Sequence, residues 1–225
     1  MSDVKQRLRD GETIVAVNLA GANPDLMESL QRFGADLAFI DCERTGIGLD
    51  VATEMIRAAR ACALPCVVRS PNHQAATLVQ FLDRKVDGLV VPHVDTPEQA
   101  ASVVELTRYA CGAEAGKRLV IVQIETRKAV ECVDELAQVE GIDAFLIGPN
   151  DLAYDLTGRR GAQTAETEQA LDDVCARLMA AGRRFGMPSR IDEMATFRRR
   201  GCTLLYYPVE WLIERSLAEL KAALR

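Results

Sequence analysis

Long apolar segments and basic clusters are both missing from this sequence. No apolar segment at the N-terminus approaches the length of a signal peptide, and no apolar run among the 225 residues is long enough to span a bilayer. The net charge is −6, the pI is near 5.1, and Lys and Arg are scattered apart from Arg198-Arg199-Arg200. These absences argue against membrane proteins and nucleic-acid binders. We expect a cytoplasmic protein in which the three arginines form a solvated helix end.

Disulfide and zinc patterns are also absent. The seven cysteines are an odd number without C-x-x-C spacing, which fits reduced thiols, mostly as small core residues. No linker or low-complexity tract interrupts the chain. With 48% hydrophobic and 27% charged residues, the chain suits one α/β domain spanning residues 1–225.

Short apolar runs alternate with segments of helical periodicity along the whole chain. The runs occupy residues 13–19, 37–40, 66–68, 88–91, 119–125, 144–147, 184–187 and 203–207. Helices are expected over 24–33, 51–62, 73–84, 127–138, 165–181, 192–200 and 210–224, with another opened by the N-cap Thr96 and Pro97. Continuous apolar runs separated in this way indicate parallel strands buried on both faces. Eight alternations predict a (β/α)8 TIM barrel. A doubly wound open sheet is the alternative, but no Gly-rich phosphate fingerprint follows the first run.

Two carboxylates stand where the fifth and sixth runs end. Glu125 closes the fifth run, and Asp151 follows the Gly148-Pro149-Asn150 break after the sixth. Parallel α/β folds keep their active sites at the carboxyl ends of the strands. We therefore predict that Glu125 and Asp151 lie in a functional site.

The residues around these carboxylates resemble a known family. Residues 122–127 (VQIETR), 139–143 (VEGID) and 147–152 (IGPNDL) are similar to the signature of the HpcH/HpaI family, the class II metal-dependent 2-oxo-acid aldolases related to the citrate lyase β-subunit. Supporting matches are Ile40-Asp41 with Glu43, Val67-Val68-Arg69, and Val91-Pro92 with Val94-Asp95-Thr96. The resemblance implies a TIM barrel of the phosphoenolpyruvate/pyruvate-binding type, a divalent ion, and pyruvate or a similar 2-oxo acid as the bound core of the substrate.

The two carboxylates are suitable ligands for the divalent metal that the resemblance implies. Glu125 and Asp151 can converge on one hard cation, and few protein ligands with several waters suit Mg²⁺ or Mn²⁺. Such an ion would stabilise the enolate formed when a C–C bond breaks or forms. A strand-end salt bridge and a helix N-cap would explain the same residues without a metal. The resemblance also assigns the backbone of the turn Gly148-Pro149-Asn150-Asp151 to the substrate carboxylate.

Arg69 and Gln123 are two further candidates for the functional site. Arg69 matches the family arginine that holds the 2-oxo acid and polarises its keto oxygen, and a guanidinium has the fork geometry for that role. A structural ion pair across the barrel mouth is the alternative. Gln123 faces the same way as Glu125 by strand alternation, which predicts a contact with the substrate or with the site. A buried polar residue would show the same pattern.

Three features depart from the family pattern. Arg44 replaces the family's catalytic His, and an arginine stays protonated, so it cannot be a general base. Only residues 110–118 stand where the family carries a long active-site loop, which predicts a more open pocket or one completed by another subunit. Residues 206–211 (YYPVEW) are bulkier than the family version, which predicts an altered acceptor side.

The missing base leaves several candidates. His93 ends the fourth strand, His73 lies four residues past Arg69, and Glu43 follows the second strand. Each side chain can accept a proton, although both histidines could equally be structural. Arg44 itself could bind a second substrate anion.

These observations predict a metal-dependent carbon–carbon lyase, an aldolase acting on a 2-oxo acid such as pyruvate and on an aldehyde or acyl partner. One alternative is an enzyme of the citrate synthase or citrate lyase type that condenses or cleaves acyl-CoA and 2-oxo acids. Another is a non-catalytic descendant that binds a small acid. The final helix has more apolar residues than one barrel flank requires, so we expect a homo-oligomer built from dimers; they are Trp211, Leu212, Ile213, Leu217, Leu220 and Leu224.

Overall fold

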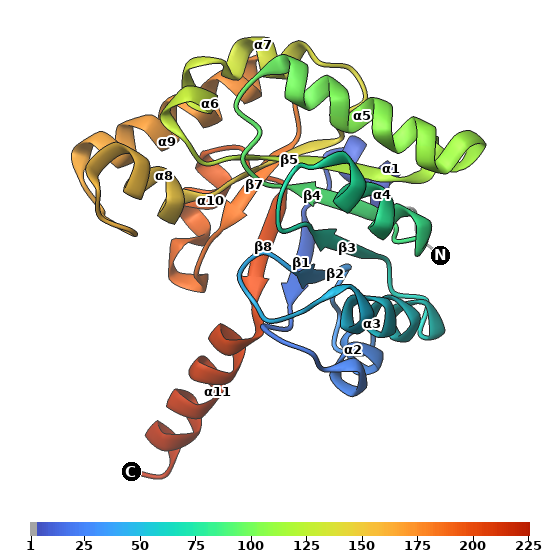
Figure 1. Cartoon of the computed structure of the whole chain (residues 1–225). Helices are drawn as coiled ribbons and strands as arrows, with labels where there is room; N and C mark the ends of the chain where they lie inside the picture. Colours follow the sequence, from blue (N-terminus) through green and yellow to red (C-terminus); the bar gives the residue numbers. More distant parts are fainter. Residues whose placement is uncertain (1–3) are drawn as a thin grey trace.

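Eight parallel strands close into a barrel in the computed structural model, which describes residues 4–225 (Figure 1). Each strand pairs with the next along the chain, and β8 pairs with β1. The strands are β1 Ile14–Asn18, β2 Leu37–Asp41, β3 Cys66–Arg69, β4 Gly88–Val91, β5 Leu119–Ile124, β6 Ala144–Ile147, β7 Phe185–Pro188 and β8 Leu204–Pro208. The predicted (β/α)8 TIM barrel is confirmed, and the doubly wound open sheet is wrong because β8 pairs with β1 and leaves no open edge.

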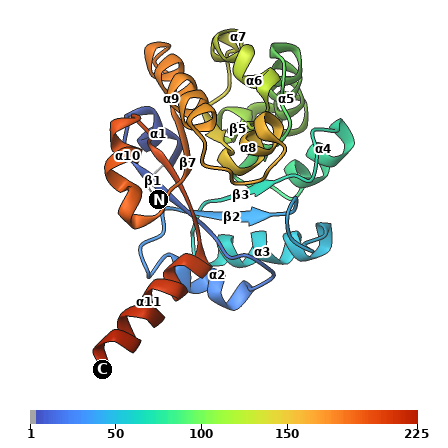
Figure 2. The ribbon, with the colours of Figure 1, turned by 90° about the vertical axis from the view of Figure 1, so that its left-hand side faces the viewer.

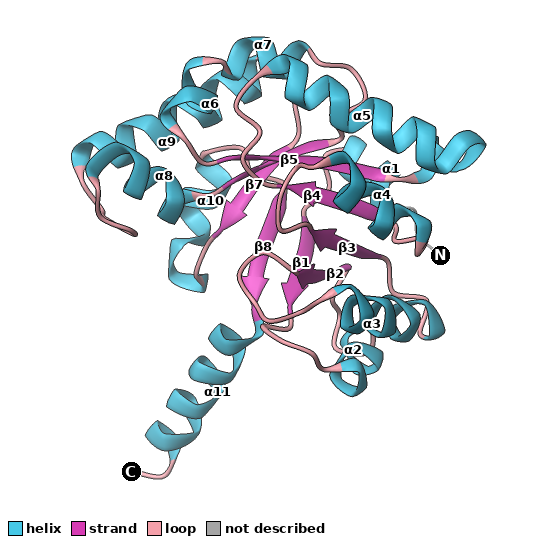
Figure 3. Cartoon of the chain, in the orientation of Figure 1, coloured by secondary structure: helices cyan, strands magenta, loops and turns pink. Residues whose placement is uncertain are grey.

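Helices alternate with the strands and surround most of the barrel (Figure 3). They are α1 Val4–Arg9, α2 Pro24–Leu30, α3 Leu49–Ala61, α4 Ala75–Asp83, α5 Pro97–Cys111, α6 Arg127–Glu131, α7 Val133–Gln138, α8 Pro149–Thr157, α9 Ala165–Ala180, α10 Met194–Arg199 and α11 Val209–Ala223. Two 3₁₀ helices, η1 Gly112–Lys117 and η2 Ile191–Glu193, precede β5 and α10.

Most predicted helices lie within a few residues of their expected bounds. The cap at Thr96 is present as a capping box, in which its hydroxyl accepts the Gln99 N–H and the Gln99 side chain accepts the Thr96 N–H. The helix expected over 127–138 is two helices, because the chain breaks at Cys132. The short helix α1 was not predicted. It is held by burial of Val4 and Leu8 rather than by a sequence signal.

Two apolar layers hold the barrel together. The inner layer fills the barrel with inward side chains such as Ile14, Phe39 and Ile121, and α1 covers its amino-terminal end with Val4 and Leu8. The outer layer lies between the strands and the surrounding helices. Strand alternation separates the layers, since residues two apart along a strand share a face.

Close strand packing explains one glycine. A Cβ atom at Gly186 in β7 would lie 1.6 Å from the carbonyl oxygen of Leu204 in β8. No side chain fits in that space, so β7 and β8 can approach only because position 186 is glycine.

The inward register places polar side chains above the inner apolar layer. Asn18, Asp41, Arg69 and Gln123 each follow inward apolar residues on their own strands, near the carboxyl ends. All four are buried. The barrel therefore ends, at its carboxyl face, in a polar layer on which a site can be built.

The last helix lies apart from this framework. Figures 1 and 2 show α11 leaving the end of β8 and projecting away from the barrel, and none of its residues is buried. The exposed apolar side chains are Leu212, Ile213, Leu217, Leu220 and Leu224. In the part of the chain described, no helix combines the length and the apolar character needed to cross a membrane.

The sequence also predicted reduced cysteines and a solvated run of three arginines. All seven cysteines are free thiols, and four of them are buried. The arginine run was expected to be solvated, which is wrong for Arg200. Its side chain is 11% exposed and forms ion pairs of 2.7 Å with Glu168 and Asp172, because the end of α10 packs against α9.

Candidate functional site

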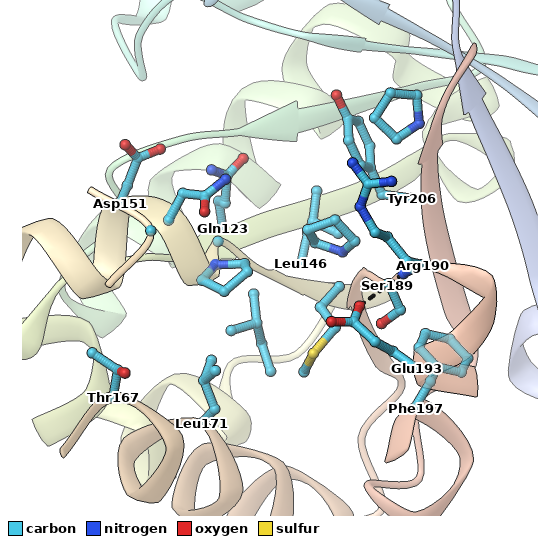
Figure 4. Close-up of a pocket in the computed structure, with 18 of the residues that line it drawn as sticks. Gln123, Leu146, Asp151, Thr167, Leu171, Ser189, Arg190, Glu193, Phe197 and Tyr206 are labelled. Atoms are coloured by element: carbon cyan, nitrogen blue, oxygen red, sulfur yellow. Dashed lines mark hydrogen bonds between the residues drawn. The ribbon is translucent and has the colours of Figure 1, made fainter. Parts of the chain in front are cut away.

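A cleft of about 580 Å³ opens at the carboxyl end of the barrel. Figure 4 shows Asp151 and Gln123 on one side of it and Tyr206 and Arg190 on the other. Seven residues predicted for the site from the sequence line this cleft, namely Arg44, Arg69, Gln123, Gly148, Pro149, Asn150 and Asp151, whereas Glu43, His93 and Glu125 are not among its lining residues. The structure therefore gathers side chains from β3, β5 and the segments after β2 and β6 around one space.

Arg69 is anchored by two acids. Its Nε donates to Asp41 Oδ1 over 2.9 Å, and its Nη2 donates to Asp41 Oδ2, which gives a fork-to-fork pair. Its Nη1 lies 3.1 Å from Glu43 Oε2. Burial alone would lower the pKa of Arg69, but the hydrogen bonds to Asp41 and the two negative charges raise it overall. Arg69 is thus a fixed, oriented cation at the barrel mouth.

Glu125 is the most deeply buried acid at the mouth, with its side chain 1% exposed. Its Oε1 accepts the backbone N–H of His93 over 2.8 Å, and its Oε2 accepts a hydrogen bond from the Gln123 amide. A Cβ atom at Gly148 would lie 3.2 Å from Glu125 Oε2, so the turn before α8 lies against the carboxylate. Burial raises the pKa of Glu125, and the negative charges of Glu43 and Asp151 act in the same direction.

Asp151 lies in the first turn of α8 and is held by two arginines. Arg44 Nη2 is 2.8 Å from Asp151 Oδ2, and Arg160 Nε is 3.5 Å from Asp151 Oδ1. Arg44 also lies 3.8 Å from Glu43 Oε1. The position where the sequence resemblance led us to expect a base therefore holds a cation that pairs with a candidate metal ligand.

The three candidate bases lie in different places. The ring of His93 lies between Glu43 and Glu125, and Glu43 is buried beside Arg69. His73 is exposed before α4, and the ion pairs that join Glu43, His93 and Glu125 do not include it. Geometry therefore keeps Glu43 and His93 as groups next to Glu125 and sets His73 aside.

The residues at the mouth fit a divalent cation. One ligand atom each from Glu43, His93 and Glu125 lies within 4.8 Å of the other two. Glu43 Oε2 and Gln123 Oε1 are buried without a hydrogen-bond partner among the described residues. Oxygen atoms of carboxylates and side-chain amides are the ligands that a hard cation prefers, and the Glu43 oxygen in question also lies 3.1 Å from Arg69 Nη1. A divalent metal is thus compatible with this donor set.

One expectation about the pocket was wrong in its location. Residues 110–118 connect α5 to the start of β5, so they lie at the amino-terminal end of the barrel, away from Glu125. Ala115, Gly116 and Arg118 line a second, small cavity there. The short connection does not border the main cleft within this chain. By contrast, Tyr206, Pro208 and Trp211 do line it.

Some residues that line the cleft were not predicted from the sequence. Ser189 and Arg190 directly follow β7, so the rule that strand ends carry the site could have found them. The guanidinium of Arg190 stacks on Trp211, with 4.6 Å between its central carbon and the ring centroid. Arg160 lies in a loop after α8, and no pattern in the sequence marks it.

The chain is similar to several known proteins. A family model described as HpcH/HpaI aldolase/citrate lyase matches residues 15–207. A 4-hydroxy-2-oxovalerate aldolase from Novosphingobium aromaticivorans is 33% identical over 218 residues, covering 86% of this chain and 82% of that protein. A hydroxypyruvate/pyruvate aldolase from Deinococcus radiodurans is 29% identical, covering 98% and 89%. The solved structure of a HpcH/HpaI aldolase/citrate lyase family protein from Burkholderia cenocepacia J2315 matches 100% of both chains, with a TM-score of 0.90 and 26% identity.

Proposed function

The chain belongs to the HpcH/HpaI aldolase/citrate lyase family, and we propose that it is a metal-dependent carbon–carbon lyase acting on a 2-oxo acid such as pyruvate. The observation that carries this proposal is the convergence of Arg69, Gln123, Glu125 and Asp151 at the carboxyl face of the barrel. Its relatives are named as aldolases of hydroxypyruvate, pyruvate and 4-hydroxy-2-oxovalerate, which supports the same class of small-molecule substrate.

Glu125 and Asp151 are the proposed holders of the metal. Glu125 directly follows β5 and Asp151 lies in the first turn of α8, so both belong to the carboxyl face of the barrel, and the negative charge of Asp151 acts to raise the pKa of Glu125. Oxygen ligands of this kind favour Mg²⁺ or Mn²⁺. When bound, a divalent ion would stabilise negative charge that develops on the substrate as the C–C bond breaks or forms.

The protein's own groups would orient the 2-oxo acid. Asp41 fixes the Arg69 guanidinium, so that its positive charge is in place for the keto oxygen before the substrate arrives. The amino-terminal turn of α8 offers the backbone N–H groups of Asn150 and Asp151 and the positive end of the helix dipole to the substrate carboxylate, while the Gly148 N–H donates to the Ile124 carbonyl and Pro149 has none. Arg69 and the first turn of α8 would therefore bind the keto oxygen and the carboxylate of the 2-oxo acid, respectively.

Proton transfer would differ from the family pattern. Arg44 cannot accept a proton, while Glu43 and His93 adjoin Glu125 and can. Solvent in the cleft is a third acceptor. The identity of the second substrate, an aldehyde or an acyl compound, would be set by the part of the cleft near Arg190 and Trp211.

The assembly is proposed to be a homo-oligomer built from dimers. The exposed apolar residues of α11 have no counterpart to cover them among the described residues of one chain. A second copy that covers this helix would remove that surface from water.

A proton-exchange assay tests the proposed function. The wild type should exchange the C3 protons of pyruvate with solvent only when a divalent metal is present. Glu125→Ala and Asp151→Ala should abolish that exchange and leave the circular dichroism spectrum unchanged, because strand-end residues contribute little to the core. Glu135→Ala, an exposed acid on α7, is the matched control and should retain exchange. Full activity after loss of both carboxylates and exhaustive chelation would refute the proposal.

A further inference from the structure

The imidazole of His93 lies between two buried carboxylates. Its Nδ1 is 3.2 Å from Glu125 Oε1, and its Nε2 is 3.3 Å from Glu43 Oε1. The carboxylate side chains are 1% and 7% exposed, whereas the imidazole is 49% exposed. The three side chains come from the carboxyl ends of β2, β4 and β5, so the barrel itself sets their spacing.

The backbone at His93 is constrained to produce this arrangement. Its φ is +56°, in the left-handed region that non-glycine residues seldom adopt. The N–H of the same residue donates to Glu125 Oε1 over 2.8 Å, which ties the strained turn to the carboxylate. Backbone strain held in this way clusters at functional sites.

Among residues 4–225, no arginine or lysine forms an ion pair with Glu125, and His93 is the group that faces its carboxylate. The other acids at the mouth have arginine partners. Arg69 Nη1 lies 3.1 Å from Glu43 Oε2, while its Nε and Nη2 are engaged by Asp41. Asp151 is paired with Arg44 and Arg160. Glu43 Oε1, the oxygen that faces His93, and Glu125 Oε1 thus leave a place for a cation on the two sides of the imidazole.

We propose that His93 donates one ring nitrogen directly to the divalent ion, with one oxygen each from Glu43 and Glu125. The proposal rests on the metal dependence put forward above and adds the His93 nitrogen and a Glu43 oxygen to the ligands proposed there. The candidate atoms lie within 4.8 Å of one another, and two ligands on opposite sides of an ion lie ~4.2 Å apart, so a small inward shift forms one coordination shell. The second ring nitrogen remains a donor to a neighbouring carboxylate, as is usual for histidine ligands.

A nitrogen ligand changes which metals the site prefers. Imidazole suits Zn²⁺, Cu²⁺, Fe²⁺ and Ni²⁺, while carboxylate, carbonyl and water oxygens suit Mg²⁺, Ca²⁺ and Mn²⁺. We therefore expect the affinity of this protein for Zn²⁺ relative to Mg²⁺ to fall when His93 is replaced.

The chain offers a direct test, because it contains only two histidines. Electron spin-echo envelope modulation of bound Mn²⁺ detects a coordinated imidazole nitrogen without reference to catalysis. The wild type and His73→Ala should show the nitrogen modulation. His93→Asn should lack it, and its Mn²⁺ affinity measured by titration should fall by at least the ~10–100-fold that loss of a supporting partner causes. Asparagine is chosen because it tolerates positive φ, and His93→Gly is the second variant.

The outcomes separate the two proposals. If Mn²⁺ binds the wild type without nitrogen modulation, and His93→Asn and His93→Gly bind it equally well, His93 is not a ligand and this proposal is overturned. The metal-dependent lyase then stands with Glu125 and Asp151 alone. If no variant and no wild-type sample binds a divalent ion, both this proposal and the proposed function are wrong.

Discussion

Arg44 Nη2 lies 2.8 Å from Asp151 Oδ2, which places a fixed positive charge on one of the two acids proposed to hold the metal. The same arginine stands where the sequence resemblance led us to expect a histidine base. One substitution therefore accounts for two differences: the site loses a proton acceptor, and Asp151 gains a competing partner.

Replacing this arginine by the family residue should increase activity. Arg44→His introduces a group that titrates near neutral pH and removes the ion pair from Asp151. We expect pyruvate proton exchange and aldol turnover with a short aldehyde to rise by ~10²–10⁴-fold, the usual contribution of a positioned general base. Arg160→His, at the longer and more exposed of the two pairs, should change turnover little. No gain from Arg44→His would instead favour a role for Arg44 in binding a second anion.

The Arg69–Asp41 pair should be important for stability as well as for substrate binding. The side chains are 11% and 3% exposed, so Asp41→Asn removes the buried charge that pairs with two guanidinium nitrogens and leaves Glu43 as the remaining acid beside Arg69. We expect the free energy of unfolding, measured in urea, to fall by ~1.5–3 kcal/mol, the range for hydrogen bonds to charged groups. The exposed Arg57–Glu54 pair on α3 provides the comparison, and Glu54→Gln there should cost less than ~1 kcal/mol. Equal effects of the two variants would show that burial does not decide the outcome.

The buried Glu125 should make metal-free stability depend on pH. Burial raises its pKa above the ordinary value, so the folded protein keeps this proton to higher pH than the unfolded chain does. The free energy of unfolding contributed by this group therefore falls as pH rises from below the ordinary value through the raised one. Glu125→Gln cannot lose that proton, and it keeps an acceptor for the His93 N–H.

Thermal unfolding in the presence of a chelator measures this effect. The melting temperature of Glu125→Gln minus that of the wild type should increase from acidic to neutral pH. Added Mn²⁺ should stabilise the wild type but not the variant. A difference that stays constant across this pH range would contradict the raised pKa.

The exposed face of α11 should control assembly. Ile213, Leu217, Leu220 and Leu224 follow helical spacing and lie in solvent within one chain. We expect sedimentation at micromolar concentration to show an oligomer, and Leu217→Glu with Leu220→Glu to shift it toward the 24.6 kDa monomer. Ala222→Glu, which lies opposite that face, should leave the assembly intact. A wild type found only as a monomer would refute the proposed oligomer.

The sequence by itself determined the barrel and the acids at its mouth. Continuous apolar runs indicate strands that are buried on both faces. Eight such strands, each connected to the next by a helix, can pair in parallel in only a few folds, of which the closed barrel is one. Strand alternation likewise assigned Gln123 and Glu125 to one face before any contact was known, and the structure joins them by a hydrogen bond. Both inferences depend on the local periodicity of apolar residues, which can be read from one sequence alone.

Only the tertiary structure decided how these residues are paired. Asp41 with Arg69, Arg44 with Asp151, and His93 between Glu43 and Glu125 join residues on different strands, and their partners depend on how the barrel closes. The left-handed backbone at His93 and the amino-terminal location of residues 110–118 were equally invisible in the sequence. Closure brings together segments far apart in the chain. Periodicity records which face a side chain takes, but not which neighbour it meets across the barrel.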